Sequence, residues 1–323
     1  MVNPESDNYI PQEERTRRAL AELVGDPDVR VLRRFLKRPG YNAAPPGAVI
    51  HHGLYLDLET TGLDTETAEV IELGAARFTF GDDGTIFTVG ETFTGFEQPS
   101  KPIEPEITKI TGITNEMVEG KVIESGDMDR LCDGVELAVA HNADYDRKIS
   151  ERRWKYRFEH LPWACSYKQV DWKLRGSVGS KLGNILMTLR GQFYDAHRAY
   201  DDALVGIDVL NHVHEGRSAM AELLDTTRAG VFRVYAHGAP FEVKDRLKAR
   251  GFFWTGEKPW KRDFASRPEA EAEVVWLRER SFSRQPEIKR INAKHRYSTR
   301  EEAKAAVILR AIEETSADPG PYA

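Results

Sequence analysis

The chain has 323 residues, of which 40% are hydrophobic and 30% are charged, and its formal net charge is −6. This composition is typical of a globular protein, and no apolar run approaches the roughly 20 residues that a membrane span needs. The N-terminus has no apolar stretch typical of a secretory signal, so we expect a cytoplasmic protein. The two cysteines, Cys132 and Cys165, fit no metal-ligand spacing and are expected to be reduced, buried side chains.

Charge is distributed unevenly along the chain. Residues 231–323 contain 19 lysines and arginines against 14 acidic residues, whereas residues 1–230 contain 27 against 38. An acidic body with a basic C-terminal region is compatible with a metal-loaded acidic site and a separate contact with nucleic acid.

Residues 1–48 are predicted to form a helical extension and a linker. Segments 16–24 and 29–38 have apolar residues at helical spacing with basic residues between them, which predicts one or two polar helices. The stretch that ends at Ala48 is rich in proline and glycine, as linkers are. These helices could bind a partner or pack on the rest of the chain.

A mixed α/β unit is predicted over residues 49–228. Its second and third strands form a hairpin through a turn at 81–84, and a loop with proline and glycine follows at 102–114. The predicted strands are 53–59, 70–80, 85–96 and 136–142, and the predicted helices are 128–135, 144–154, 181–189 and 199–213. A hairpin followed by alternating strands and helices predicts a mixed sheet flanked by helices.

The pattern changes at about residue 230, where a small α+β module is predicted over 229–282. Its predicted elements are a strand, a helix, a hairpin and a second helix, at 231–237, 243–251, 252–264 and 269–280. A tail that is first basic and then helical is expected over 283–323.

Two carboxylates stand at the end of the first strand of the α/β unit. Because alternate residues of a strand point to the same face, Asp57 and Glu59 project together from an otherwise apolar strand. Adjacent acids repel each other and are costly near an apolar core, and a divalent cation such as magnesium or manganese removes that cost. The alternative is a solvated strand end with incidental acids.

A second acidic segment follows the strand at 136–142, where a helix begins. His141, Asn142, Asp144 and Asp146 lie at a strand's carboxyl end, where sites form in open α/β sheets. An acid at a helix start is commonly only a cap, so these residues alone do not choose between Asp144 and Asp146.

A third segment opens the predicted helix at 199–213. His197 lies on a loop, and Asp201 and Asp202 lie in the next helical turn, so the histidine and an acid can address one site from two directions. Histidine can accept a proton at neutral pH and act as a general base. The alternative is a surface histidine before an acid-rich helix start.

Together, in order and approximate spacing, the three segments resemble the motifs of the DEDDh exonuclease family. Its members include the epsilon proofreading subunit of bacterial DNA polymerase III, RNase T and oligoribonuclease. The resemblance covers about residues 50–225, implies an RNase H-like fold, and selects Asp146 over Asp144 and Asp202 over Asp201. The matching residues are Asp57, Glu59, Thr60, Thr61 and Gly62, then His141, Asn142, Tyr145 and Asp146, then His197, Ala199 and Asp202.

The resemblance implies a 3′→5′ exonuclease that releases nucleoside 5′-monophosphates with the help of two divalent cations, Mg²⁺ or Mn²⁺. The four acids Asp57, Glu59, Asp146 and Asp202 would hold the cations, and His197 would take the proton of the attacking water. By the same resemblance, the residues expected to contact the terminal nucleotide are Thr60, Thr61, Leu63, His141 and Asn142.

The C-terminal module interleaves basic and aromatic residues. Its Lys-Asp-x-Leu-Lys-x-Arg-Gly stretch, followed by tryptophans, resembles small modules attached to bacterial exonucleases and other proteins. Basic side chains can neutralise phosphates and aromatic rings can stack on bases, although the aromatics could equally form a core within a solvated surface. The expected nucleic-acid contacts are Lys244, Lys248, Arg250, Trp254, Lys258, Trp260 and Lys261.

These observations favour an active exonuclease that trims DNA in proofreading or repair. Its expected partners are nucleic acid with a 3′ end, single-stranded DNA above all, and a polymerase or repair protein. Trimming of RNA 3′ ends is the alternative, because nothing in the predicted site distinguishes a 2′-hydroxyl. A catalytically silent nucleic-acid-binding or polymerase-accessory module is a third hypothesis, which the complete set of four acids and a histidine disfavours.

Overall fold

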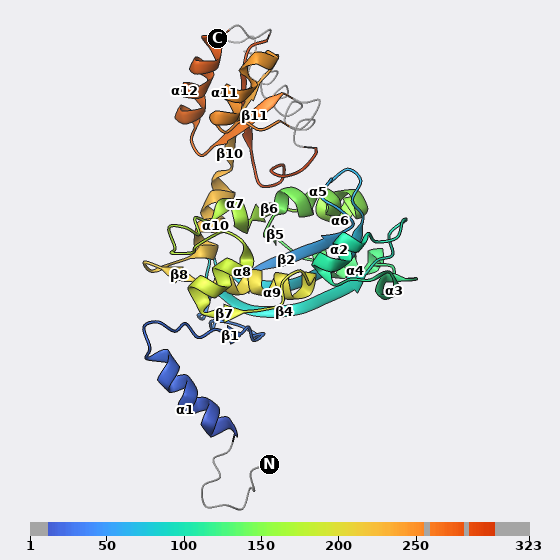
Figure 1. Cartoon of the computed structure of the whole chain (residues 1–323). Helices are drawn as coiled ribbons and strands as arrows, with labels where there is room; N and C mark the ends of the chain where they lie inside the picture. The colour runs from blue at the N-terminus through green and yellow to red at the C-terminus, as the bar shows by residue number, and fades with distance from the viewer. Residues whose placement is uncertain (1–11, 255–258, 281–283, 301–323) are drawn as a thin grey trace, which may run out of the picture.

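The computed structural model describes residues 12–254, 259–280 and 284–300. Figure 1 shows a layered central domain, with the C-terminal module on one side of it and an N-terminal helix that projects from the other side. None of the helices in the described ranges is long and apolar enough to cross a membrane.

The central domain is built on a five-stranded sheet in the order β4-β3-β2-β5-β6. The β2–β3 and β3–β4 pairs are antiparallel, whereas β2–β5 and β5–β6 are parallel. The strands are β2 (His51–Thr60), β3 (Val70–Phe80), β4 (Ile86–Phe96), β5 (Leu137–Ala140) and β6 (Trp163–Cys165). This mixed sheet, flanked by helices, confirms the predicted RNase H-like α/β fold.

Alternation along β2 sends its side chains into two cores. Leu54, Leu56 and Leu58 pack on the face covered by α4, α5 and α6, whereas Tyr55 packs on the face covered by α8 to α10. Asp57 and Glu59 follow the parity of Tyr55 and therefore face α9. The helices are α4 (Ser125–Cys132), α5 (Ala143–Arg153), α6 (Lys155–Phe158), α7 (Ser166–Gln169), α8 (Leu182–Ile185), the π-helical turn η1 (Leu186–Arg190), α9 (Ala199–Leu210) and α10 (Ala219–Ala229).

The segment 102–114 is helical where we predicted a loop. It contains α2 (Pro105–Thr111), and α3 (Asn115–Val118) follows it. Proline in the first turn needs no hydrogen-bond partner, and Gly112 ends α2 in the left-handed conformation at φ 72°, with its N–H 2.8 Å from the carbonyl oxygen of Thr108. The same proline and glycine that indicated a loop are thus the start and stop of a short helix.

The N-terminal extension contains α1 (Gln12–Val24), which buries no side chain. The second predicted helix, at 29–38, is wrong, because that segment is extended and its β1 (Arg33–Arg34) pairs in parallel with β7 (Gln192–Phe193). The Phe35 N–H donates to the Phe193 carbonyl at 2.8 Å, and the Phe35 side chain joins the core of the central domain. Strand pairing and burial of Phe35 outweigh the weak helical periodicity.

The C-terminal module is a three-stranded antiparallel sheet in the order β11-β10-β12, covered by helices, as the predicted small α+β module requires. Within the described part of the hairpin predicted at 252–264, Phe253 and Lys261 form an isolated bridge, and β11 also pairs with β10. Part of the expected basic tail forms β12, and the helix expected after residue 300 lies outside the described residues. The elements are β10 (Val231–Ala236), η2 (Phe241–Val243), α11 (Lys244–Ala249), β11 (Trp260–Phe264), α12 (Arg267–Arg278) and β12 (Glu287–Ile291).

A buried arginine fastens the chain after β12 to the central domain. Arg147 on α5 is fully buried, and its Nε lies 2.8 Å from Glu151 Oε1. Its guanidinium donates to the carbonyl oxygens of Ala293, Lys294 and Arg296 at 3.1, 2.7 and 2.7 Å. The segment 292–300, here called the return segment, therefore forms a second connection between the module and the domain, besides the direct passage from α10 into β10.

Replacing Arg147 with methionine should lower the free energy of unfolding by about 3 kcal/mol, because three carbonyl oxygens and Glu151 lose a buried charged donor. Chemical denaturation of the full chain measures the loss. Arg153→Met on the same helix is the control, since it removes a more exposed ion pair with Glu97 and should cost about 1 kcal/mol or less. Equal losses in the two variants would contradict the assigned role of Arg147.

Candidate active site

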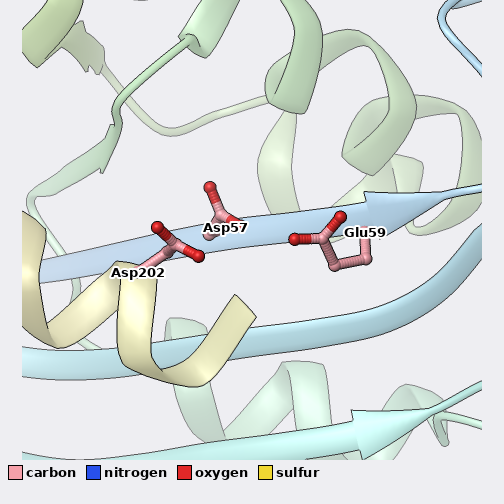
Figure 2. A group of neighbouring side chains, drawn as sticks. All are labelled: Asp57, Glu59 and Asp202. Carbon is pink, nitrogen blue, oxygen red and sulfur yellow. The ribbon is translucent and has the colours of Figure 1, made fainter. Parts of the chain in front are cut away.

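Four acidic side chains from three elements converge at the carboxyl end of β2. Asp57 and Glu59 come from β2, Asp146 from the first turn of α5 and Asp202 from the first turn of α9. Carboxylate oxygens of Asp57, Glu59 and Asp202 lie within 4.8 Å of one another, and Figure 2 shows these three side chains gathered between β2 and the start of α9. Asp146 is buried, and its charge raises the pKa of Asp57 and of Glu59.

A glycine opposite Asp57 lets α9 approach the sheet. Gly74 on β3 is the register partner of Asp57. A Cβ atom at this position would lie only 2.0 Å from the backbone carbon of Ala199. Any side chain at residue 74 would thus displace the start of α9, and Asp202 with it. A glycine inside a strand is the signal in the sequence for such a close approach.

Backbone and side-chain donors orient Asp202. Its Oδ2 accepts from the backbone N–H groups of His197 and Arg198, at 2.9 and 3.2 Å. Its Oδ1 accepts a short hydrogen bond from the hydroxyl of Tyr194. Asp202 is buried, so these donors fix its carboxylate where α9 begins.

An ion pair between a buried glutamate and a partly exposed arginine holds the same corner of the site. Glu72 on β3 is fully buried and accepts from Arg198 Nη2 at 2.9 Å and from the Ala199 N–H at 3.2 Å. Because Arg198 directly follows His197, this pair ties the histidine-bearing loop to the sheet. Arg198 is therefore a positioning residue that the three motifs alone do not identify.

His197 lines the cleft from an exposed loop. Its backbone adopts φ 67°, a left-handed conformation that is uncommon for residues other than glycine and is enriched at functional sites. None of the described residues hydrogen-bonds its imidazole, so the ring can engage a molecule in the cleft.

The acids lie on the floor of an open cleft of about 700 Å³. Two apolar side chains stand exposed on its lining, Leu63 at 92% and Ile110 at 56% of their surface. The cleft is also lined by residues that could not be predicted, because they come from segments outside the three motifs. These residues are Tyr167, Lys181, Asn184 and Tyr194.

Of the five residues expected to contact the nucleotide, all but Thr61 line the cleft. The Thr61 hydroxyl instead accepts from the Glu69 N–H at 2.9 Å and shapes the loop after β2. Thr60 lines the cleft, and its hydroxyl is held by the Gly62 carbonyl and by Tyr145. Leu63 and Asn142 also line the cleft, and within the described residues the Asn142 side chain forms no hydrogen bond.

His141 supports the cleft wall from within. Its ring nitrogens lie 2.9 Å from Ser166 Oγ and 2.7 Å from the carbonyl oxygen of Ser180. Burial lowers the pKa of His141 to about 4, so the ring is neutral near neutral pH. Because both nitrogens already have partners, His141 can contact a nucleotide only by packing.

Burial raises the pKa of every acid in the cluster, and repulsion from neighbouring acids adds to it for Asp57, Glu59 and Asp146. Burial, followed by the charges of Asp202 and Asp146, raises the pKa of Asp57 well above its usual range. The same causes, led by burial, raise the pKa of Glu59 to about 8. Burial raises the pKa of Asp146 to about 7, although hydrogen bonds from backbone N–H groups lower it. Burial also raises the pKa of Asp202, although the hydrogen bond from Tyr194 lowers it.

The cluster fits a divalent cation. In the described part of the chain, neither Asp57 nor Glu59 forms an ion pair. The nearby Arg198 charge lowers the pKa of Glu59, but burial and the neighbouring acids outweigh it. Oxygen ligands at this spacing suit hard divalent cations, and a bound cation would favour the ionised form of each acid.

The expected nucleic-acid contacts of the C-terminal module fall into two groups. Lys244, Lys248, Trp254 and Trp260 line a second cleft, in the module itself. Arg250 instead forms an ion pair with Glu273 at 2.6 Å, and the Lys261 side chain is buried. Lys258 lies outside the described residues.

An RNase H-like sheet with a crowded acidic centre at the end of its middle strand defines a nuclease domain. The family model described as Exonuclease matches residues 54–210. DNA polymerase III subunit epsilon of Aquifex aeolicus is 30% identical over 165 residues, a match that covers 50% of this chain and 79% of that protein. The chain therefore belongs to the DEDDh exonuclease family.

Other proteins resemble parts of the chain. The PolC-type DNA polymerase III of Thermotoga petrophila is 33% identical over 168 residues, which are 48% of this chain but 11% of the polymerase. The chain thus spans about a tenth of that relative's length. The structure of E. coli Exonuclease I in complex with a dA16 oligonucleotide is similar over 84% of this chain and 75% of its own, at 15% identity and a TM-score of 0.44.

The acidic cluster predicts how the stability of the metal-free protein depends on pH. An unfolded chain releases carboxylic protons at about pH 4, whereas Glu59 and Asp146 in the folded site keep them to about pH 8 and 7. Because the unfolded state binds fewer protons in this window, stability should fall as pH rises from about 4 to 8 in chelator. Thermal unfolding measured across this range tests the sign.

Asp57→Asn removes one of the repelling charges, so it should raise the Tm of the metal-free protein at pH 8 by a few degrees, at about 2–4 °C per kcal/mol. Asp133→Asn, which changes an exposed acid at the end of α4, is the matched control and should leave Tm unchanged. A lower Tm in the Asp57→Asn variant would argue against electrostatic crowding in the cluster.

Proposed function

We propose that this chain is a metal-dependent 3′→5′ exonuclease that releases nucleoside 5′-monophosphates from DNA. The convergence of Asp57, Glu59, Asp146 and Asp202 beneath one open cleft, with His197 on its wall, carries the proposal. The name of the Aquifex aeolicus relative, a DNA polymerase III subunit, supports DNA over RNA and a role in proofreading or repair.

The four acids would hold divalent cations, Mg²⁺ or Mn²⁺, and leave one side of the site open to the cleft. When bound, such cations stabilise charge on the scissile phosphate and lower the pKa of a water ligand. The chain contributes a ligand set that is oriented in advance. Asp202 is fixed by Tyr194 and two backbone N–H groups, and Asp57 is fixed on a central strand.

His197 would act as the general base. Its exposed ring stands on the cleft wall, next to the loop position held by the Arg198–Glu72 ion pair. From there the imidazole can accept the proton of the attacking water while the loop backbone remains hydrogen-bonded to Asp202.

The terminal nucleotide would lie between the apolar rim and the acids. Exposed Leu63 and Ile110 offer a surface against which a base can pack, and Tyr145 holds the loop of Leu63 through Thr60 and the Gly62 carbonyl. Lys181 and Asn184 line the same cleft and supply polar groups for phosphate or sugar.

Asp57→Ala should abolish hydrolysis, because it removes an oxygen ligand that none of the other acids replaces. The assay uses 5′-labelled single-stranded DNA and RNA of the same sequence, each with magnesium, with manganese and with chelator. A ladder that shortens from the 3′ end, and that is lost in chelator and in the variant, is the expected result.

Unimpaired turnover by a folded Asp57→Ala protein would contradict the proposal, and Asp133→Ala serves as the control for an acid outside the cleft. The faster of the two polymers identifies the substrate class. If the RNA is shortened faster, the proposed function becomes trimming of RNA 3′ ends in place of trimming of DNA.

His197→Ala should slow hydrolysis by about 10²–10⁴-fold, the usual contribution of a positioned general base. The fall should appear in kcat, and DNA binding in chelator should stay close to that of the wild type. His160→Ala, which removes an exposed imidazole outside the cleft, is the control. A rate for His197→Ala within a few-fold of the wild type would exclude His197 as the base.

A further inference from the structure

The C-terminal module contains a cleft of about 660 Å³ that is separate from the acidic one. It lies beside the end of β10, the start of α11 and the start of β11, and Arg284 lines it from the segment before β12. No acidic residue of the described chain lines it, although the chain as a whole is acidic.

Aromatic rings form the walls of this second cleft. The rings of Trp254 and Trp260 are stacked, with centroids 6.3 Å apart and an interplanar angle of 25°. Trp254 remains 59% exposed and Phe241 74% exposed, so both still present a ring to solvent. A tryptophan pair with one open face is a surface on which a planar base can stack.

Three cations surround these rings. Lys244 and Lys248 are one helical turn apart on α11 and therefore share a face, and Arg284 also lines the cleft. The Lys244 ammonium lies 3.7 Å from the centroid of the Phe241 ring. Within the described residues, no acidic side chain pairs with any of the three, in contrast to Arg250 and its partner Glu273.

We propose that this cleft is a second binding site, for single-stranded DNA. Unpaired bases can stack on Trp254 and Phe241, whereas the bases of a duplex are covered by their neighbours. The three cations can neutralise phosphates of a strand, and none of the described lining residues is acidic and would repel them. The site uses Phe241 and Arg284, which composition alone did not identify, and excludes Arg250 and Lys261.

The connection between module and domain gives this site a consequence for hydrolysis. Arg147 and the return segment hold the module on the central domain, so a strand bound in the module is tethered to the domain that carries the acidic cleft. A tethered strand has a high effective concentration at the second site. Long strands should therefore bind more tightly than strands too short to reach both clefts. This consequence rests on the proposed exonuclease function, whereas the binding itself does not.

The test measures binding of 5′-fluorescein-labelled oligothymidylate of about 20 nucleotides to the full chain in chelator, by anisotropy over a range of salt concentrations. Trp254→Ala should weaken binding about tenfold, the effect of losing one stacked base. Lys248→Glu should weaken it as well, and should reduce the slope of log Kd against log salt by about 0.7 for each phosphate that the protein no longer neutralises.

Arg246→Glu is the matched control. Arg246 is exposed on the same helix and receives the same change of charge, but it does not line the cleft. Wild-type affinity in both Trp254→Ala and Lys248→Glu would overturn the proposal. Equal losses of affinity in Lys248→Glu and Arg246→Glu would overturn it as well, because binding would then depend only on the net charge of the module. Competition by thymidine monophosphate as effective as that by the oligomer would indicate a mononucleotide site instead.

Hydrolysis of a trinucleotide, measured beside binding, separates the two proposals. Trp254→Ala should cleave it at the wild-type rate, because Trp254 lies outside the acidic cleft. If the wild type fails to cleave but binding depends on Trp254, the exonuclease proposal falls and the second site stands. If the wild type cleaves the trinucleotide but substitution of Trp254 and Lys248 leaves the affinity for the oligomer unchanged, only the proposal of a second site is rejected.

Discussion

Repulsion among four acids in one small volume is the constraint on which the rest of the domain depends. Carboxylates near an apolar core favour separation or protonation, and the raised pKa values of Asp57, Glu59 and Asp146 express that tendency. The fold opposes it with rigid features, namely the close approach at Gly74 and the donors around Asp202. Such a site is stable in full only when a cation neutralises it, which links occupancy of the site to stability of the fold.

Much of this arrangement follows from local rules. The period of two along a strand places Asp57 and Glu59 on one face, and the three motifs fix which acids belong together. What could not be predicted depends on contacts between distant segments. Residues 29–38 are extended because Phe35 finds a place in the core and β7 offers a free edge, and neither partner is visible in the segment itself. The hydrogen bond from Tyr194 to Asp202 could not be predicted either, because Tyr194 lies outside the three motifs and only the fold brings the two side chains together.

The C-terminal module illustrates the limit of composition as a guide. Its basic residues look equivalent in the sequence, yet Arg250 is held by Glu273, Lys261 is buried, and Lys248 faces a cleft. Whether a cation can meet a phosphate depends on which acids the fold places beside it. Sheet pairing decides this for Lys261, whose strand is fixed by β10.

Helix α5 joins the two halves of the molecule through adjacent residues. Successive side chains of a helix point about 100° apart, so Asp146 can face the acidic cluster while Arg147 faces the return segment. A displacement of that segment would move the Arg147 side chain and, through the first turn of α5, the Asp146 carboxylate. Removing the module is therefore not a neutral way to test it, because Arg147 would lose three carbonyl acceptors inside the central domain. Point substitutions on the module's exposed cleft leave this connection intact, and they alone separate strand binding from the integrity of the active site.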